Sequence, residues 1–247
     1  MSTYETLLSS SNTRGAAYLV LVDPDKIDGN GFPKFIQHAT AAGVDGFLVG
    51  GSLVLADTFE ECIRTMKKNT NVPVVIFPGS VQQISKEADA ILYLSLLSGR
   101  NAEHIIGSQV TAAPIIKKMK LEAISTAYML VESGKTTSAE FMSNTKPLPR
   151  NKPDIAVAHA LAAEYMGFKL LYLEAGSGAE HSVPEEMIAA VVKYCSVPLI
   201  VGGGIRTPDD ARKKVKAGAK FVVTGNVLEK DGSKDLIREF AAAIHSR

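Results

Sequence analysis

Three glycine-rich segments in the second half of the chain have the composition of a phosphate-binding site. Their sequences are Y-L-E-A-G-S-G at 172–178, G-G-G-I-R at 202–206 and T-G-N at 224–226. Glycines let backbone N–H groups approach a ligand closely, and N–H groups at the start of a helix bind anions. A single G-G-G would be better explained by a tight turn. Three such segments, each at the end of a short apolar run, favour phosphate binding.

Glu174 stands at the end of an apolar run, where a carboxylate is costly to bury unless it is paired or used. Burial raises the pKa of a carboxyl group toward the value that a general base needs near neutral pH. Tyr172 lies two residues earlier, on the same face of an expected strand, and could hydrogen-bond the same ligand. We therefore treat Glu174 and Tyr172 as candidate catalytic residues. A structural ion pair of Glu174 with Lys169 or Lys220 is the open alternative.

Asp23 follows the first apolar run, in the sequence D-P-D-K, and is a candidate metal ligand. Mg²⁺ is commonly held by one or two carboxylates, while substrate phosphates and water complete its octahedron. Ser52, at the end of the next apolar run, could add a hydroxyl ligand. Asp and Pro also favour turns, so a plain turn explains D-P-D equally well on spacing alone.

Short apolar runs bounded by Gly, Pro or Asp are the elements that must position these residues. They read as continuous stretches, as strands covered on both faces do in a parallel sheet. Eight are found, at 16–22, 46–49, 72–77, 90–97, 122–131, 170–173, 199–201 and 221–224. Helical patterns fill most gaps, at 32–42, 58–68, 154–166, 184–194 and 208–217.

Two of the gaps differ from the rest. The segment 79–89 is too short for a helix that covers a strand, so we expect an extended or one-turn connection there. The segment 133–153 is rich in Ser, Thr, Asn, Lys and Pro, which predicts a long loop. Eight strands alternating with helices over 247 residues predict a single-domain (β/α)8 barrel, an α/β fold, spanning 1–247. An open doubly wound sheet is weaker, because no G-x-G-x-x-G follows the first strand.

Composition excludes several classes of protein and of partner. The hydrophobic content of 46% is that of a globular chain, and the net charge of +1 argues against nucleic acid or an anionic membrane as an obligate partner. Cys62 and Cys195 lie far apart without metal-ligand spacing, as in reduced cytosolic proteins. No signal peptide and no apolar run long enough to span a bilayer is visible, so we expect a cytoplasmic protein.

Taken together, the motifs resemble those of the geranylgeranylglyceryl phosphate synthase family, to which bacterial heptaprenylglyceryl phosphate synthases are related. The shared segments are D-P-D-K, Y-L-E-A-G-S-G, G-G-G-I-R and T-G-N, with V-G-G-S at 49–52 and L-L-S-G-R-N at 96–101. The resemblance spans 21–226. G-G-G-I-R is common among phosphate-binding barrels, whereas Y-L-E-x-G-S-G together with D-P-D-K is far more specific.

The resemblance implies a modified (β/α)8 barrel in which the helix after strand three is replaced by a short extended segment, which matches the short gap at 79–89. It implies a Mg²⁺-dependent prenyltransferase that joins sn-glycerol 1-phosphate to geranylgeranyl diphosphate through an ether bond. Mg²⁺ would bind Asp23 and Ser52. The glycerol phosphate would bind Tyr172, Leu173, Glu174, Ala175, Gly176, Ser177, Gly178, Gly203, Gly204, Gly225 and Asn226. A homo-oligomer, and transient membrane contact during product release, are also expected.

One position departs from part of the family. Some members carry a Lys two residues before the first Asp, where this chain has Leu21, which points to the subgroup without that Lys. Prenyl chain lengths of the C15, C20 and C35 classes stay open on the residues, and C20 follows from the resemblance. We expect the prenyl tail beside 79–89. The alternatives are a phosphosugar isomerase or aldolase and a non-catalytic phospholigand-binding barrel.

Overall fold

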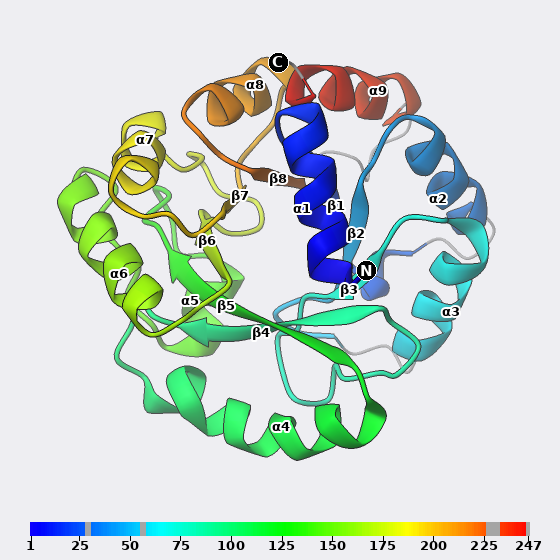
Figure 1. Cartoon of the computed structure of the whole chain (residues 1–247), viewed down its shortest axis with the longest axis horizontal. Helices are drawn as coiled ribbons and strands as arrows, with labels where there is room; N and C mark the ends of the chain where they lie inside the picture. Colours follow the sequence, from blue (N-terminus) through cyan, green and yellow to red (C-terminus); the bar gives the residue numbers. More distant parts are fainter. Residues whose placement is uncertain (28–30, 55–57, 226–232, 246–247) are drawn as a thin grey trace.

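Eight parallel strands pair in chain order and close into a barrel (Figure 1). The structure is a computed structural model that describes residues 1–27, 31–54, 58–225 and 233–245. The ring closes between the first and last strands, where Ala17 pairs with Phe221. This confirms the predicted (β/α)8 barrel over the open sheet. The strands are β1 (Ala17–Val22), β2 (Gly46–Val49), β3 (Val74–Ile76), β4 (Ala90–Leu96), β5 (Glu122–Leu130), β6 (Leu170–Glu174), β7 (Leu199–Gly202) and β8 (Phe221–Thr224).

Helices from the gaps between the strands surround the barrel (Figure 1). Five lie where the sequence patterns predict them: α2 (Phe32–Ala41), α3 (Phe59–Asn69), α6 (Pro153–Tyr165), α7 (Glu185–Tyr194) and α8 (Pro208–Lys216). The patterns did not predict α1 (Thr3–Arg14), α4 (Ser108–Met119) and α9 (Ser233–Ile244). A π-helical turn, η2 (Glu103–Gly107), precedes α4, and Pro114 lies inside α4. The π-helical turn and the proline both obscure the helical pattern of this region in the sequence.

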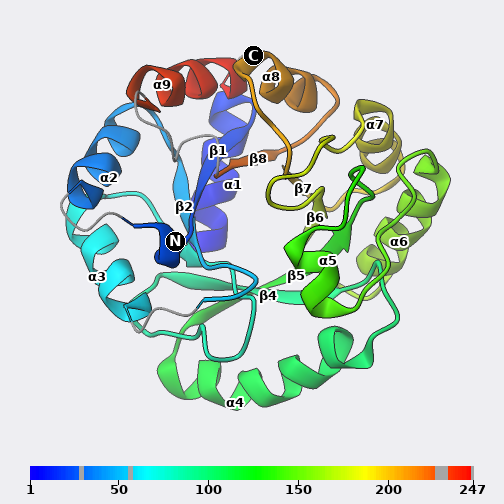
Figure 2. The same ribbon diagram turned by 180° about the vertical axis from the view of Figure 1, so that it is seen from behind.

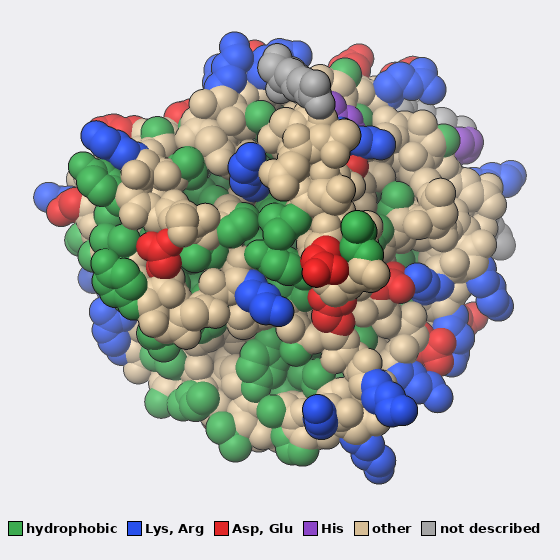
Figure 3. Space-filling model, in the orientation of Figure 1, with side chains coloured by type: hydrophobic (Ala, Val, Ile, Leu, Met, Phe, Trp, Pro, Cys, Tyr) green, Lys and Arg blue, Asp and Glu red, His purple; other side chains and the backbone are tan. Residues whose placement is uncertain are grey.

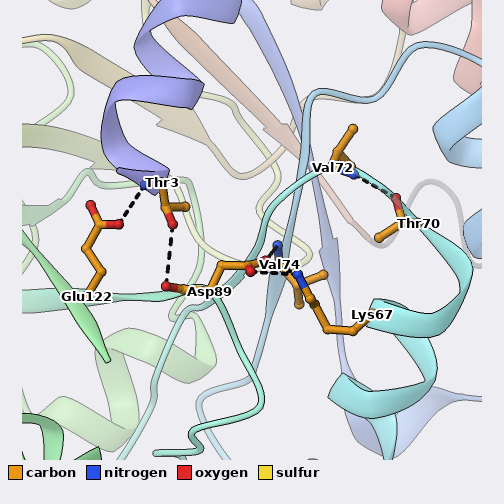
Figure 4. Close-up of polar contacts among 7 residues, drawn as sticks. All are labelled: Thr3, Lys67, Thr70, Val72, Val74, Asp89 and Glu122. Atoms are coloured by element: carbon orange, nitrogen blue, oxygen red, sulfur yellow. Dashed lines mark hydrogen bonds and ion pairs between the residues drawn. The ribbon is translucent and has the colours of Figure 1, made fainter. Parts of the chain in front are cut away.

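No helix connects β3 to β4, as expected for the modified barrel. Residues 77–89 form turns and bends instead. Asp89 holds the end of this segment against α3, because its carboxylate pairs with the Lys67 ammonium at 2.6 Å and accepts the Val74 N–H at 2.8 Å (Figure 4). The short crossover is thus tied down by polar contacts where other crossovers use a packed helix.

The helix α1 covers the amino-terminal end of the barrel (Figure 1). Its first N–H groups donate to the carboxylate of Glu122, from Thr3 at 2.6 Å and from Tyr4 at 3.1 Å, and Figure 4 shows the first of these contacts. A carboxylate at this position also complements the positive end of the helix dipole. Leu7 is buried on the barrel side of the helix. Since this end is closed, the strand ends at the opposite face are the place for a site.

The segment predicted as a long loop, 133–153, contains a short helix, α5 (Ser138–Ser143). Thr137 caps its first turn by accepting the N–H of Glu140, which is the N-cap pattern of a helix start. A bridge between Val131 and Leu148 ties the end of the segment to the barrel. The prediction of a plain loop was therefore wrong, and Figure 2 shows α5 on the face opposite α1.

The charge pattern of the surface agrees with the near-zero net charge. On the face that carries α1, Lys and Arg side chains are scattered around the rim and do not form one patch (Figure 3). Within the described ranges, no helix combines the length and the apolar character that crossing a membrane requires.

Candidate active site

The carboxyl ends of the strands bring most of the predicted site residues to the end of the barrel opposite α1 (Figure 2). The parallel register aligns Glu174 with Gly202, and it places Val22, directly before Asp23, beside Val49. Gly225 directly follows β8. Asn226, the last residue predicted for the phosphate site, lies outside the described residues.

Glu174 is buried at this end of the barrel, with 6% of its surface exposed. Its Oε1 accepts the N–H of Gly176 at 2.7 Å. Burial raises the pKa of the Glu174 carboxyl to about 7, against the opposing effects of the Gly176 N–H and the Tyr172 hydroxyl. In the part of the chain that the structure describes, Glu174 forms no ion pair, so the predicted alternative of a structural salt bridge finds no support. A carboxyl with this pKa can accept a proton at neutral pH.

Tyr172 lies directly below Glu174 on the inner face of β6 and is fully buried. Its hydroxyl lies over Gly202 beside the Glu174 carboxylate, since a Cβ on Gly202 would lie 2.6 Å from that oxygen and 2.7 Å from Oε2 of Glu174. The hydroxyl makes no hydrogen bond of ordinary geometry with any described residue. Burial, and then the nearby Glu174 charge, raise the pKa of Tyr172 well above its usual value. The hydroxyl thus interacts with the Glu174 carboxylate and lies where it could also meet a polar ligand group.

Two further aromatic side chains lie inside the barrel against Tyr172. Phe77 stacks on its ring at a centroid distance of 5.2 Å, and Tyr128 meets the same ring edge-on at 5.3 Å. Tyr128 lies opposite Tyr172 in the β5–β6 register. This cluster could not be predicted from the sequence, because Phe77, Tyr128 and Tyr172 come from three segments that are far apart in the chain. The cluster forms an apolar floor beneath the polar end of the site.

The other residues of segment 172–178 do not all face the ligand side. Leu173 is fully buried among the side chains that pack between the strands and the outer helices, so a ligand meets it only through its backbone. Ala175 is buried in the same layer, whereas Ser177 and Gly178 are exposed. The alternation along β6 explains why Leu173 faces away from Tyr172 and Glu174, whereas Ser177 and Gly178 lie in the loop after the strand.

Gly203 shows why the G-G-G segment excludes larger residues. Its φ of +78° is one that L residues rarely adopt. A Cβ at this position would overlap Oε1 of Glu174 and lie 2.5 Å from the backbone nitrogen of Gly176. The G-G-G turn and the segment after β6 therefore form one close-packed backbone cradle around the Glu174 carboxylate.

Two arginines from other segments hold the loop that follows β6. Arg206, after the G-G-G turn, donates from Nη2 to the carbonyl of Ala179 at 2.8 Å. Arg150, before α6, donates from Nη1 to the carbonyl of Ser182 at 3.3 Å. Hydrogen bonds from charged donors are stronger than those between neutral groups. Neither arginine was predicted, because a carbonyl acceptor leaves no signature in side-chain types.

Lys214 on α8 completes this support from below the loop. Its side chain is 2% exposed, and its ammonium lies 2.6 Å from the carbonyl of Val183 and 2.6 Å from the Glu185 carboxylate. The three cations and Gly204 line a cavity of about 300 Å³ beside the glycine cradle, together with the carboxylates of Glu180, Glu185 and Asp210. The loop after β6, which carries Gly176 and Gly178, is thus held by three cationic side chains that bind its carbonyls.

Asp23 and Ser52 lie on the other side of the site, after β1 and β2. Asp23 borders the β2 loop, because a Cβ on Gly51 would lie 3.6 Å from its Oδ1. Its Oδ1 also accepts the N–H of Asp25 at 3.2 Å, and its Oδ2 lies 3.5 Å from the Lys26 ammonium. Asp23 therefore caps the turn at 24–26 and at the same time places its carboxylate at the candidate metal site.

The donors at Asp23 and Ser52 suit a cation such as Mg²⁺, which takes oxygen ligands. Among the described residues, no group of three or more His, Cys, Asp or Glu side chains could enclose a metal. The donor set therefore fits an ion that takes one carboxylate from the protein and its remaining ligands from phosphate oxygens and water. It does not fit a cage made of protein alone.

The family model described as the PcrB family matches residues 11–244. The chain belongs to the PcrB family. Among its relatives, a geranylgeranylglyceryl phosphate synthase from Chitinophaga pinensis is 46% identical, over 93% of this chain and 90% of its own length. A protein of the same name from Thermococcus gammatolerans is 45% identical, also over 93% of this chain and 90% of its own length.

A solved structure of the same PcrB fold gives a close match in three dimensions. The crystal structure of (S)-3-O-geranylgeranylglyceryl phosphate synthase from Thermoplasma acidophilum, in complex with its substrate sn-glycerol-1-phosphate, is 35% identical. It matches with a TM-score of 0.94 and covers 99% of each chain. These relatives confirm the family resemblance that the sequence motifs indicated.

Proposed function

We propose that this PcrB family member is a geranylgeranylglyceryl phosphate synthase, a prenyltransferase that joins sn-glycerol 1-phosphate to geranylgeranyl diphosphate. The names of its relatives support this activity. The observation that carries the proposal is the buried Glu174 carboxyl. Its pKa is about 7, and it lies beside a glycine-rich backbone that is suited to bind a phosphate. One strand end thus provides a proton acceptor beside an anion site.

The glycerol phosphate binds in the cradle formed after β6, β7 and β8. Backbone N–H groups of the glycine segments 177–178 and 203–204 and of Gly225 surround its phosphate, and the Tyr172 hydroxyl meets a polar oxygen of the glycerol. The Arg150, Arg206 and Lys214 side chains fix the loop after β6 beside the cradle through its backbone carbonyls.

In the reaction, a glycerol hydroxyl forms a new bond to carbon 1 of the prenyl chain, and the bond from that carbon to the diphosphate oxygen breaks. Glu174 takes the proton of the attacking hydroxyl, and the electron pair of the broken bond leaves with diphosphate. Burial of Glu174 keeps water from competing with the glycerol hydroxyl. The enzyme therefore supplies a base at one end of the reacting line and charge neutralisation at the other.

Asp23 and Ser52 would hold Mg²⁺ at the diphosphate end. When bound, the ion stabilises the negative charge that develops on the departing diphosphate oxygens. Asp23 provides the carboxylate that attracts it, and the exposed position of Lys26 lets that side chain move aside.

Further expectations go with this activity. The prenyl tail lies beside the helix-free segment 79–89, whose Val81 and Ile84 are partly buried against the core. The chain acts as a single barrel domain in the cytoplasm, assembles as a homo-oligomer and meets a membrane transiently when it releases its lipid product.

A product assay tests the proposed function. The protein is incubated with sn-glycerol 1-phosphate, Mg²⁺ and prenyl diphosphates of the C15, C20 and C35 classes, and phosphate that partitions into organic solvent is measured. The proposal expects product with the C20 substrate above the other lengths. The control replaces the glycerol phosphate by its sn-3 enantiomer. Product with none of the three lengths would overturn the proposal.

A further inference from the structure

The segment that replaces the missing helix, 78–89, lies in direct backbone contact with the loop after β2. A Cβ on Gly79 would overlap the carbonyl of Gly51 and lie 2.9 Å from Cα of Ser52. A Cβ on Gly50 would overlap the carbonyl of Phe77, at the exit from β3. Glycine on both sides lets the two backbones approach closely.

Gln83 joins these two backbones from within the segment. Its side chain is buried, with 4% of the residue exposed. Its Oε1 accepts the N–H of Gly51 at 3.3 Å and the N–H of Gly79 at 3.2 Å, and its Nε2 donates to the carbonyl of Gly51 at 2.9 Å. One amide thus satisfies both backbone groups of Gly51, which fixes the orientation of the peptide units on either side of that residue.

The fixed loop borders the candidate metal ligands. Ser52 follows Gly51 directly, and Oδ1 of Asp23 lies beside the Gly51 backbone. The N–H of Gly50 donates to the carbonyl of Val22 at 3.1 Å, which ties the loop to the residue before Asp23. A contact chain therefore runs from Gln83 through Gly51 to both Asp23 and Ser52.

We propose that Gln83 is a positioning residue for the diphosphate end of the site. It holds the backbone of Gly51 so that Ser52 and Asp23 present their oxygens together to the prenyl diphosphate and its metal. This role rests on the proposed function. The role also accounts for the helix-free crossover, because an irregular segment can place a buried amide against a loop of the site. The amide is neutral, so it supports Asp23 without adding a charge beside it.

The kinetic test compares Gln83→Met with Gln37→Met. Methionine keeps the length of glutamine but makes no such hydrogen bonds, and Gln37 is an exposed glutamine on the outer helix α2, away from the segment beside which the prenyl tail is expected. We expect Gln83→Met to raise the KM for geranylgeranyl diphosphate about tenfold, as the loss of backbone anchoring predicts. The KM for sn-glycerol 1-phosphate should change less than about twofold, and Gln37→Met should match the wild type. A Gln83→Met variant with unchanged KM values would overturn the inference.

The hydrogen bonds of Gln83 to Gly51 and Gly79, here called the Gln83 clamp, can be tested by amide hydrogen exchange. This test does not depend on activity and applies to the wild-type protein as well. The N–H groups of Gly51 and Gly79 should exchange slowly in the wild type and at least about tenfold faster in Gln83→Met. The N–H of Gly176, which Glu174 accepts, serves as the internal control and should not change. Fast exchange of Gly51 and Gly79 in the wild type would show that Gln83 does not hold the loop, whether or not the protein makes product. Absence of product with intact protection would instead refute the proposed function and leave the clamp standing.

Discussion

The two sides of the site solve the same problem, the fixing of a loop at a strand end, by different means. On the β6–β8 side, three cations donate to loop carbonyls, and Lys214 is the most deeply buried of them. On the β1–β3 side, the neutral amide of Gln83 holds the loop beside Asp23. The cations on the β6–β8 side are balanced by the carboxylates of Glu180, Glu185 and Asp210, which line the same cavity, so they hold the loop without leaving a large net charge there. The amide of Gln83 holds the β1–β3 loop without adding to the charge of Lys26, which pairs with Asp23.

Glu174, on the β6–β8 side, is the proposed base, so its replacement should have the largest effect. Glu174→Gln keeps the acceptor for the Gly176 N–H and removes the base, so we expect kcat to fall by about 10² to 10⁴. In the wild type, kcat/KM should fall about tenfold for each pH unit below the pKa of about 7. Steady-state kinetics across pH 5.5–9 measure both. A variant that keeps the wild-type rate and pH profile would exclude Glu174 as the base.

The same substitution predicts a change in stability with a definite sign. The folded pKa of Glu174, about 7, lies above its ordinary value of 4.5. Its contribution to stability is therefore complete below pH 4.5 and is lost as the pH rises through about 7. Glu174→Gln should accordingly raise the free energy of unfolding at pH 8 by up to about 3 kcal/mol and flatten its pH dependence. Urea denaturation of both proteins at pH 5 and pH 8 measures the difference. If Glu174→Gln is less stable than the wild type at pH 8, burial does not destabilise the charged Glu174 carboxylate.

Asp23→Asn tests the diphosphate side alone. Without the carboxylate, we expect kcat/KM for geranylgeranyl diphosphate to fall by about 10² to 10³, because charge on the leaving group is no longer neutralised. The KM for sn-glycerol 1-phosphate should stay within about twofold. Kinetics with each substrate varied in turn give both values. Equal losses for the two substrates would show that the sides are not separate.

Gly203→Ala tests the phosphate side by steric means. The added Cβ meets Glu174 and Gly176, and the φ of +78° adds backbone strain of about 1–3 kcal/mol. We expect the KM for sn-glycerol 1-phosphate to rise by about 10². The matched control is Gly167→Ala, which has a similar φ of +80° and open space around the new Cβ. The control should lose a comparable amount of stability and keep its activity, and equal kinetic losses in both variants would contradict the cradle.

Arg206→Met should have the smallest effect of this series. It removes the hydrogen bond to Ala179 but leaves the hydrogen bonds of Arg150 and Lys214 to the same loop in place. We therefore expect the KM for sn-glycerol 1-phosphate to rise about tenfold. Arg212→Met is the control, since Arg212 pairs with Asp209 on the surface. If the two variants have the same KM for sn-glycerol 1-phosphate, the hydrogen bond of Arg206 to the loop does not contribute to substrate binding.

Much of this architecture could be predicted from the sequence. Continuous apolar runs gave the eight strands, and the short interval between β3 and β4 gave the missing helix. Gly, Asp and Glu at strand ends carry their chemistry in the residue type, so residue type and position were enough to predict that Asp23, Glu174 and the G-G-G turn lie at the carboxyl ends of strands.

The supporting contacts could not be predicted in the same way. Arg150 and Lys214 act on backbone carbonyls 32 and 31 residues away, and any residue offers such a carbonyl. Gln83 is one of two adjacent glutamines, and only the fold shows which of them is buried. Tyr128 meets Tyr172 through strand register, a property of the closed barrel and not of either segment.

Isothermal titration of the two single-side variants tests the division of the site most directly. Asp23→Asn and Gly203→Ala are each titrated with sn-glycerol 1-phosphate, and with geranylgeranyl diphosphate in the presence of Mg²⁺. We predict that Asp23→Asn keeps its affinity for glycerol phosphate within about twofold and loses affinity for the diphosphate by at least about tenfold. Gly203→Ala should show the reverse. If either variant loses both ligands to the same extent, the two sides of the site do not bind separately.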